Sequence, residues 1–275
     1  MAIGITDIVS IDSSLIHRDK NLDLIAKYTD NTWQRFRKFS EKKNDTDQGK
    51  RAEEAVLIYL DKEQNIVYIP YDDFRDDGFK KYAPFDGIAF NKTLNIKIVT
   101  KIIQKINNEI AASSYGDISS SLRKEIFDSG IRCIEIKSTK INSKKLDKNG
   151  AIDFNKVLSN HFLTYPLYTR TGNFSLRDYV FFAKRKMGLK GFLSYEELEK
   201  AVIDNERENS SDIYIHVYMD DKKYYLIGYI TKELFFKIFE IRKLIKPRKS
   251  GRALYFVCGL TSGYSMKKIT KEFNC

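Results

Sequence analysis

A carboxylate and an ammonium group lie two residues apart in the apolar segment 131–138, which has the sequence IRCIEIKS. Side chains alternate between the two faces of a β-strand, so Glu135 and Lys137 point to one face while Ile134 and Ile136 point to the other. A carboxylate is a hard oxygen ligand for a divalent cation, and a lysine beside it can position or deprotonate a water molecule. The segment therefore predicts a metal-dependent site or, more simply, an edge strand with a solvent-facing salt bridge.

Two more acidic residues precede this strand in elements that can position them. Residues 82–90, with the sequence YAPFDGIAF, predict a turn that leads into a short strand with Asp86 at its start. Residues 49–60 predict a helix, and Glu53 lies at the edge of its apolar stripe. The stripe has the spacing i, i+4, i+7 and i+8, with Ala52, Val56, Tyr59 and Leu60.

Two choices among these acids stay open. Asp86 precedes Gly87, and Asp-Gly pairs favour turns, so Asp86 can be a turn residue instead of a ligand. Glu53 can be an exposed helix acid, and the adjacent Glu54 is an alternative to it. The acidic turn at 71–78 offers further alternatives to Asp86, namely Asp72, Asp73, Asp76 and Asp77.

The order of these elements resembles the PD-(D/E)XK nuclease superfamily. In that resemblance Pro84 and Asp86, followed by Glu135 and Lys137, form the motif, and Glu53 takes the position of the accessory acid of the first core helix. The resemblance covers about residues 49 to 235. It departs from the motif in two ways, because Phe85 separates Pro84 from Asp86 and because helical material is inserted near 96–128.

The resemblance implies a fold, a reaction and a cofactor. The fold is a mixed α/β (α+β) domain with a central mixed β-sheet flanked by helices, a restriction-endonuclease-like core. Glu53, Asp86 and Glu135 would hold one or two Mg²⁺ ions, with Lys137 near the attacking water. The protein would be a type II restriction-type endonuclease that acts on double-stranded DNA, often as a homodimer. A phage or DNA-repair nuclease of the same superfamily and a non-catalytic DNA-binding protein with this fold remain alternatives.

Composition favours a polyanionic partner and a cytoplasmic protein. The chain has 48 Lys and Arg against 37 Asp and Glu, a net charge of +11, and such a surplus favours polyanions through counterion release. No apolar run approaches the ~20 residues of a membrane span. Cys133, Cys258 and Cys275 are scattered, which fits neither a disulfide framework nor a zinc site. Only three histidines are present and no P-loop motif occurs, which argues against a zinc hydrolase, an ATPase or a helicase.

The chain of 275 residues predicts one large domain with smaller additions. We expect an N-terminal helical extension at 1–48 that ends in a polar hinge at 42–48, a nuclease core at 49–240 and a basic C-terminal segment at 241–275. Within the core, the pattern predicts a strand at 66–69, a helix pair between 98 and 125, and a helix at 195–206. It also predicts a hairpin from 213 to 230, followed by a helix at 232–239 that Thr231 caps.

Two basic stretches are candidates for contacts with DNA. Residues 165–185 alternate aromatic side chains with basic ones, which suits base stacking and phosphate contacts; the basic residues are Arg170, Arg177, Lys184 and Arg185. The segment 242–252 concentrates lysines and arginines around Pro247, which predicts an extended loop that follows phosphates; the candidates there are Arg248, Lys249 and Arg252. A solvated surface is the alternative for both stretches.

If the 242–252 segment contacts phosphates, replacing Arg248, Lys249 and Arg252 with Ala should weaken binding to all duplexes about equally. The salt dependence should also flatten by about one unit of slope for each lost contact, because fewer counterions are released. Affinity measured against salt for several duplexes tests this. An unchanged slope would reject the contact, and a loss confined to one sequence would mean that the segment reads bases.

Overall fold

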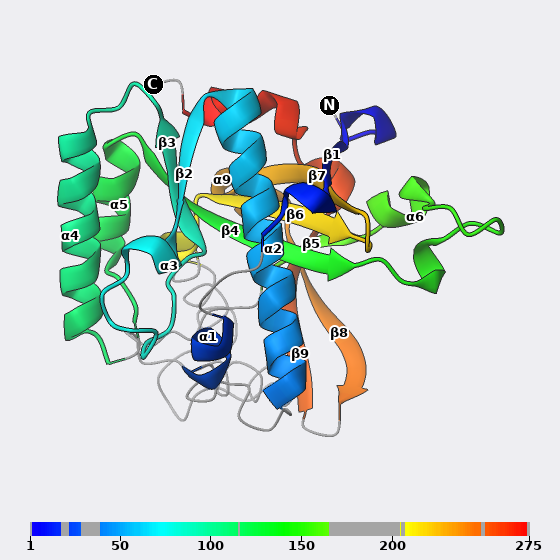
Figure 1. The fold of residues 1–275 in the computed structure, drawn as a ribbon, viewed down its shortest axis with the longest axis horizontal. Helices are drawn as coiled ribbons and strands as arrows, with labels where there is room; N and C mark the ends of the chain where they lie inside the picture. Colours follow the sequence, from blue (N-terminus) through cyan, green and yellow to red (C-terminus); the bar gives the residue numbers. More distant parts are fainter. Residues whose placement is uncertain are drawn as a thin grey trace.

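The computed structural model of the protein describes residues 2–17, 22–28, 39–114, 116–164, 204, 207–248 and 251–273. Six strands in this part of the chain form the main sheet, in the order β1-β7-β6-β4-β3-β2 (Figure 1). Their bounds are Val9–Asp12 for β1, Ile66–Pro70 for β2, Gly87–Asn91 for β3, Ile131–Lys140 for β4, Ile213–Met219 for β6 and Lys223–Thr231 for β7. Strands β4 and β6 pair in parallel and the other neighbours pair antiparallel, so the sheet is mixed.

The long helix α2, Phe39–Gln64, lies across one face of the sheet (Figure 1). Its buried side chains, among them Ala55, Val56 and Leu60, pack against Ile134 and Ile215 in one apolar cluster. The hinge expected at 42–48 is wrong, because these residues are helical and continuous with the predicted 49–60 helix. A polar segment can extend a helix that packing anchors elsewhere, and here the i,i+4 ion pair of Arg51 with Asp47 at 2.9 Å supports it.

Helices also cover the opposite face, so the expected mixed α/β architecture, with a central mixed sheet flanked by helices, is confirmed. The predicted helix pair forms α4, Ile96–Ala112, and α5, Ser120–Asp128, with Asn95 and Ser119 accepting hydrogen bonds as their N-caps. Their apolar faces pack on β3 and β4 through a second cluster that includes Ile88, Phe90, Ile131 and Cys133. The inserted pair leaves β3 and β4 adjacent, with Gly87 opposite Ile134.

The predicted hairpin and the helix that follows it are confirmed. Strands β6 and β7 pair antiparallel, and all seven side chains of β6 are buried. Helix α9, Lys232–Ile238, begins after Thr231, whose hydroxyl oxygen accepts a hydrogen bond from the Leu234 N–H at 3.3 Å. Phe235 and Phe236 of this helix pack on Tyr214 and Tyr218 of β6 in a third cluster. Of the predicted helix 195–206, only residue 204 lies within the described residues.

The N-terminal segment is more than a helical extension. It contains α1, Leu22–Tyr28, but also β1, which pairs with β7 at the edge of the main sheet. The short 3₁₀ turns η1, Ile5–Asp7, and η2, Ser13–Leu15, flank this strand. The Ile3 N–H donates to the Thr261 carbonyl at 3.1 Å, so sequence-distant segments meet beside β7.

The basic C-terminal segment does not form the loop that was expected. Strands β8, Glu240–Arg248, and β9, Gly251–Gly259, form a hairpin, which joins β5, His161–Thr164, in a second sheet. Pro247 is compatible with this ladder because it lies in the interval between paired residues Leu244 and Arg248, where the register shifts. The 3₁₀ segments η5, Leu260–Ser262, and η6, Met266–Glu272, follow.

The remaining short elements connect these strands. They are α3, Tyr71–Phe74, after β2, and η4, Ser143–Lys145, with α6, Phe154–Leu158, between β4 and β5. None of the helices in the described ranges has the length and apolar character needed to cross a membrane.

Two glycines allow the packing on α2 and on β7 to be tested with the same substitution. Gly49 lies inside α2, and no atom lies within 4 Å of the place that a Cβ would take, so Gly49→Ala should stabilise the fold by about 0.5–1 kcal/mol. At Gly228 a Cβ would lie 2.3 Å from Ile3 Cδ1 and 2.6 Å from the Tyr264 carbonyl. Gly228→Ala should therefore destabilise by about 1–3 kcal/mol. Urea unfolding measures both; a destabilising Gly49→Ala would contradict a continuous α2.

Candidate active site

Asp86 is fixed at the point where β3 begins, against the neighbouring strand β4. Its N–H donates to the Ile134 carbonyl at 3.0 Å, and its carboxylate oxygen Oδ2 accepts from the Ile136 N–H at 2.6 Å. Its carbonyl accepts from the Tyr71 N–H at 2.8 Å, which ties it to α3. Three hydrogen bonds therefore hold both the backbone and the carboxylate of Asp86.

Glu135 and Lys137 lie side by side on β4, as strand alternation predicts. The Lys137 ammonium donates to Glu135 Oε1, and the side chains of Lys137 and Glu135 remain 40% and 22% exposed, respectively. Ile134 and Ile136 point to the opposite face and join the cluster under α2. The pair thus faces away from α2 but keeps access to solvent. Burial lowers the pKa of Lys137, because it disfavours the charged ammonium. The nearby Glu135 and Asp86 carboxylates favour the ammonium more strongly, so the pKa of Lys137 is raised.

Glu53 occupies a buried position on α2, with 6% of its surface exposed, whereas Glu54 is partly exposed. Lys50 Nζ lies 2.7 Å from each Glu53 carboxylate oxygen and 2.7 Å from Asp72 Oδ2. Of the two glutamates, Glu53 is therefore the one that the helix directs into a buried ionic cluster.

The acidic turn after β2 has a different set of partners. Arg75 Nη1 lies 3.0 Å from Asp72 Oδ1, and its Nε and Nη2 donate to Asp77 at 2.7 and 3.0 Å. Asp73 and Asp76 are exposed. Of these four alternatives to Asp86, Asp72 alone among the described contacts reaches the Lys50 cluster, and it does so as a partner of two cations.

Asp86 couples the two lysine–glutamate pairs electrostatically. Burial and the nearby Glu135 carboxylate outweigh the Lys137 ammonium and raise the pKa of Asp86 to about 7. Burial, opposed by Lys50 and reinforced by Asp86, raises the pKa of Glu53 to about 8. Each glutamate has its own ammonium group, and the Asp86 carboxylate interacts unfavourably with both glutamates. The structure therefore brings the four predicted residues into one electrostatic unit built from two ion pairs.

Tyr68 on β2 belongs to the same unit, and sequence reasoning did not find it. Its hydroxyl is buried, and none of the described residues forms a hydrogen bond with it. Burial and the carboxylates of Glu53, Asp86, Glu135 and Asp72 raise its pKa well above the ordinary value. A Cβ on Gly87 would lie 2.6 Å from the Tyr68 ring, so a residue without a side chain is required there. Lys50 was missed too, although its i,i+3 spacing from Glu53 was a usable signal.

The donor chemistry of this unit fits a hard divalent cation. Mg²⁺ prefers carboxylate oxygens, and a cation near Asp86 and Glu135 would relieve the repulsion that raises the pKa of Asp86. Across the described residues, however, no three His, Cys, Asp or Glu side chains converge as a ready-made metal group. Both carboxylate oxygens of Glu53 already accept hydrogen bonds from the Lys50 ammonium group.

The other predicted residues lie outside this unit. Arg170, Arg177, Lys184, Arg185 and Lys249 are outside the described residues, while Arg248 and Arg252 lie at the end of β8 and the start of β9. His216, which pairs in register with Lys137, is buried, and its Nε2 lies 3.1 Å from Thr139 Oγ1. Burial and the charge of Lys137 lower the pKa of His216 to about 3, which agrees with a neutral packing residue.

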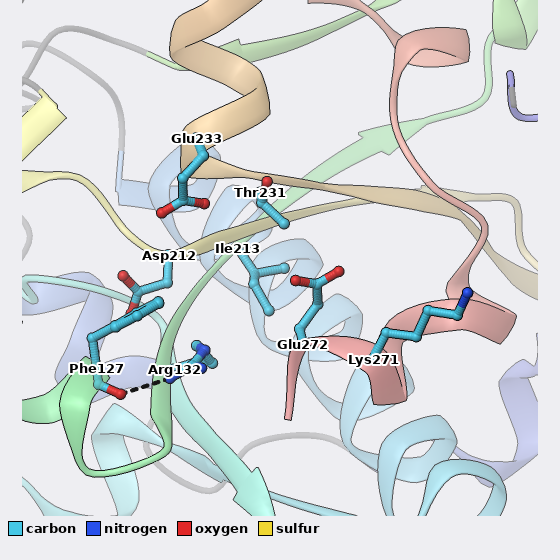
Figure 2. A pocket seen from close by; sticks show the side chains of 8 residues that line it. All are labelled: Phe127, Arg132, Asp212, Ile213, Thr231, Glu233, Lys271 and Glu272. Carbon is cyan, nitrogen blue, oxygen red and sulfur yellow. Dashed lines mark hydrogen bonds between the residues drawn. The ribbon is translucent and has the colours of Figure 1, made fainter. Parts of the chain in front are cut away.

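A small cavity of about 160 Å³ lies elsewhere, between the starts of β4 and β6 and the segment η6 (Figure 2). Its buried polar groups are already bonded within the protein. Asp212 accepts from the Cys133 N–H at 2.8 Å, and Arg132 donates to the Phe127 carbonyl at 2.8 Å. Glu272 accepts from the Tyr229 hydroxyl at 2.8 Å. The lining shares no residue with the Asp86 unit, and these bonds are those of a structural network.

The raised carboxyl pKa values predict a stability loss at alkaline pH in protein kept free of divalent ions. Unfolded carboxyls titrate near pH 4, whereas Glu53 and Asp86 titrate at about 8 and about 7 in the fold. The folded state therefore holds protons that the unfolded state releases, and stability falls as pH rises from about 5 to 9. Glu53→Gln should flatten this fall, and Glu54→Gln should not. Thermal melts in chelator measure it; equal slopes for both variants would contradict it.

Comparison of the sequence with models of protein families, with curated proteins and with solved structures gave no match. A function for the protein is therefore inferred from the side chains and geometry described above.

Proposed function

We propose that the protein is a Mg²⁺-dependent DNA endonuclease with a restriction-endonuclease-like core. One observation carries the proposal: Asp86 at the start of β3 is bonded to β4 beside Glu135 and Lys137, and Glu53 on α2 couples to Asp86 electrostatically. These are the residues that the resemblance to the PD-(D/E)XK superfamily selects. The mixed sheet with helices on both faces supports the same reading.

Each side chain has a role that its surroundings support. Asp86 and Glu135 would hold a Mg²⁺ ion, whose Lewis acidity activates water and offsets charge on the phosphate. The pKa of Lys137 is raised, so its ammonium stays protonated; it donates hydrogen bonds and stabilises negative charge, and it does not accept a proton in this form. Its 40% exposed side chain can reach a phosphate oxygen or a water at the surface of the site.

Double-stranded DNA is the substrate that the charge of the chain supports. A net charge of +11 favours a polyanion, and phosphate contacts need no base-specific groups. We place the enzyme in the cytoplasm, and a homodimer would provide one site for each strand of the duplex. A type II restriction enzyme is our first choice, with a phage or repair nuclease of the same superfamily next.

A non-catalytic DNA-binding protein is the second candidate, because both glutamates of the unit already have a lysine partner. Metal-dependent nicking of plasmid DNA distinguishes the candidates. Cleavage supports the nuclease, whereas binding without cleavage across several metals and DNA sequences supports the binding protein.

Glu135→Ala and Lys137→Ala should each lower cleavage by more than about 100-fold, because a metal ligand or a charge-stabilising group is lost. Folding and DNA binding should change little, since both side chains are partly exposed. Lys140→Ala, on the same strand and 67% exposed, is the matched control. Cleavage kinetics, a gel shift and a melt measure these effects; full activity in either variant beside a wild-type melt would reject the assignment.

Activity should require Mg²⁺ or Mn²⁺, whereas Ca²⁺ should support DNA binding with little cleavage, because its larger and looser coordination positions water poorly. Asp86→Asn should weaken the metal-dependent activity far more than Asp76→Asn, since Asp86 is buried beside Glu135 and Asp76 is exposed. Cleavage assays over a metal titration test both statements. Undiminished cutting in excess chelator, or equal effects of the two substitutions, would refute the metal site.

A further inference from the structure

Lys50 is the least expected member of the Asp86 unit, because its ammonium group lies between carboxylates that are almost fully buried. Its Nζ is 2.7 Å from both oxygens of Glu53 and 2.7 Å from Asp72 Oδ2. The side chains of Glu53 and Asp72 are each 8% exposed, and that of Lys50 is 16% exposed. Three short contacts, two from Glu53 on α2 and one from Asp72 on α3, therefore fix the position of the Lys50 ammonium group.

The three oxygens around Nζ converge on one point, as the ligands of a cation do. Divalent ions take carboxylate oxygens at about 2.0–2.6 Å, and an ammonium group takes them at about 2.7–2.9 Å. The position between Glu53 and Asp72 is thus a cation position that a side chain fills. A divalent ion placed there as well would lie within a few ångströms of the Lys50 charge, and this repulsion disfavours it.

Two further polar groups of the unit could accept a ligand, the Tyr68 hydroxyl and one carboxylate oxygen of Asp86. Among the described residues the buried Tyr68 hydroxyl has no hydrogen-bond partner, and the carboxylates of Glu53, Asp86, Glu135 and Asp72 act on it electrostatically. A buried hydroxyl without a hydrogen bond costs about 1–3 kcal/mol, so a polar group is expected next to it. Asp86 also has one carboxylate oxygen for which the described contacts give no bond, since the Ile136 N–H bonds Oδ2.

We propose that Lys50 is a positioning residue that takes the place of a second divalent ion between Glu53 and Asp72, so that the site binds one ion, on Asp86 and Glu135. The inference rests on the proposed function, and it decides between the one and two ions that the sequence left open. Glu53 then acts by holding Lys50 and by shaping the charge around Asp86, without ligating the ion.

The test counts ions in DNA-free protein. Calorimetric titration with Ca²⁺, and Mn²⁺ binding followed by electron paramagnetic resonance, should give one ion in the wild type and two in Lys50→Met, which keeps the stem but removes the charge. Without metal, Lys50→Met should melt about 5–10 °C lower, because buried Glu53 loses its ammonium partner and buried Asp72 keeps only Arg75 among its described partners. Ca²⁺ should restore its melting temperature by more than it raises that of the wild type.

The controls separate charge from packing. Lys50→Arg should keep one ion, and Lys92→Met, which removes the partner of Asp61 at an exposed pair, should leave both the count and the Ca²⁺ effect unchanged. In Lys50→Met, a further Asp72→Asn should remove the second ion. If Lys50→Met folds only with Ca²⁺, the number of ions that it retains after refolding with Ca²⁺ and removal of the excess gives the same answer.

The outcomes separate this inference from the proposed function. One Asp86-dependent ion in both the wild type and Lys50→Met leaves the nuclease proposal standing and overturns the role of Lys50. Two ions in the wild type also overturn that role. No ion in the wild type but one Glu53-dependent ion in Lys50→Met supports Lys50 as a substitute cation and contradicts the nuclease site. No ion in either protein overturns both proposals.

Discussion

The hydrogen bond from the Ile136 N–H to the Asp86 carboxylate fixes the arrangement on which the proposed chemistry depends. It joins the start of β3 to the middle of β4, and it places Asp86 beside Glu135 and Lys137. Without it, the Asp86 backbone would still be bonded to Ile134 and Tyr71, but its carboxylate would not be held against β4. The arrangement also requires Gly87 next to Tyr68, because any larger residue there would push the tyrosine ring away from the sheet. One hydrogen bond from the backbone thus positions the Asp86 carboxylate beside the Glu135–Lys137 pair.

Burying carboxylates in such a group is costly, and the protein offsets the cost with fixed cations. Lys50 forms ion pairs with Glu53 and Asp72, and Arg75 forms ion pairs with Asp72 and Asp77. Lys137 forms an ion pair with Glu135. Asp86 has no cation of its own among the described contacts, and burial raises its pKa. The three apolar clusters around the sheet offset the rest of this cost. They hold α2, α4 and α9 against the sheet through apolar contacts.

Sequence periodicity predicted the parts of the fold in which local pattern and packing agree. The hairpin β6–β7 and the capped helices α5 and α9 follow from alternation, spacing and capping residues. The polar start of α2 and the C-terminal hairpin were missed, because tertiary packing extended a helix and paired strands that local preference alone disfavours. The spacing of Lys50 and Glu53 indicated their i,i+3 pair, but the contact of Lys50 with Asp72 and the role of Tyr68 could not be predicted, since these partners come from other elements.

The edges of the main sheet restrict how two copies of this protein could associate. One edge is β1, a strand of four residues, and the other is β2, which ends at Pro70. Short edge strands and proline both discourage the addition of a further strand from another molecule. Continuation of the sheet from one protomer into the next is therefore disfavoured. A dimer that cuts both DNA strands would instead join through helices or loops, which leaves the relative orientation of its two sites to those surfaces.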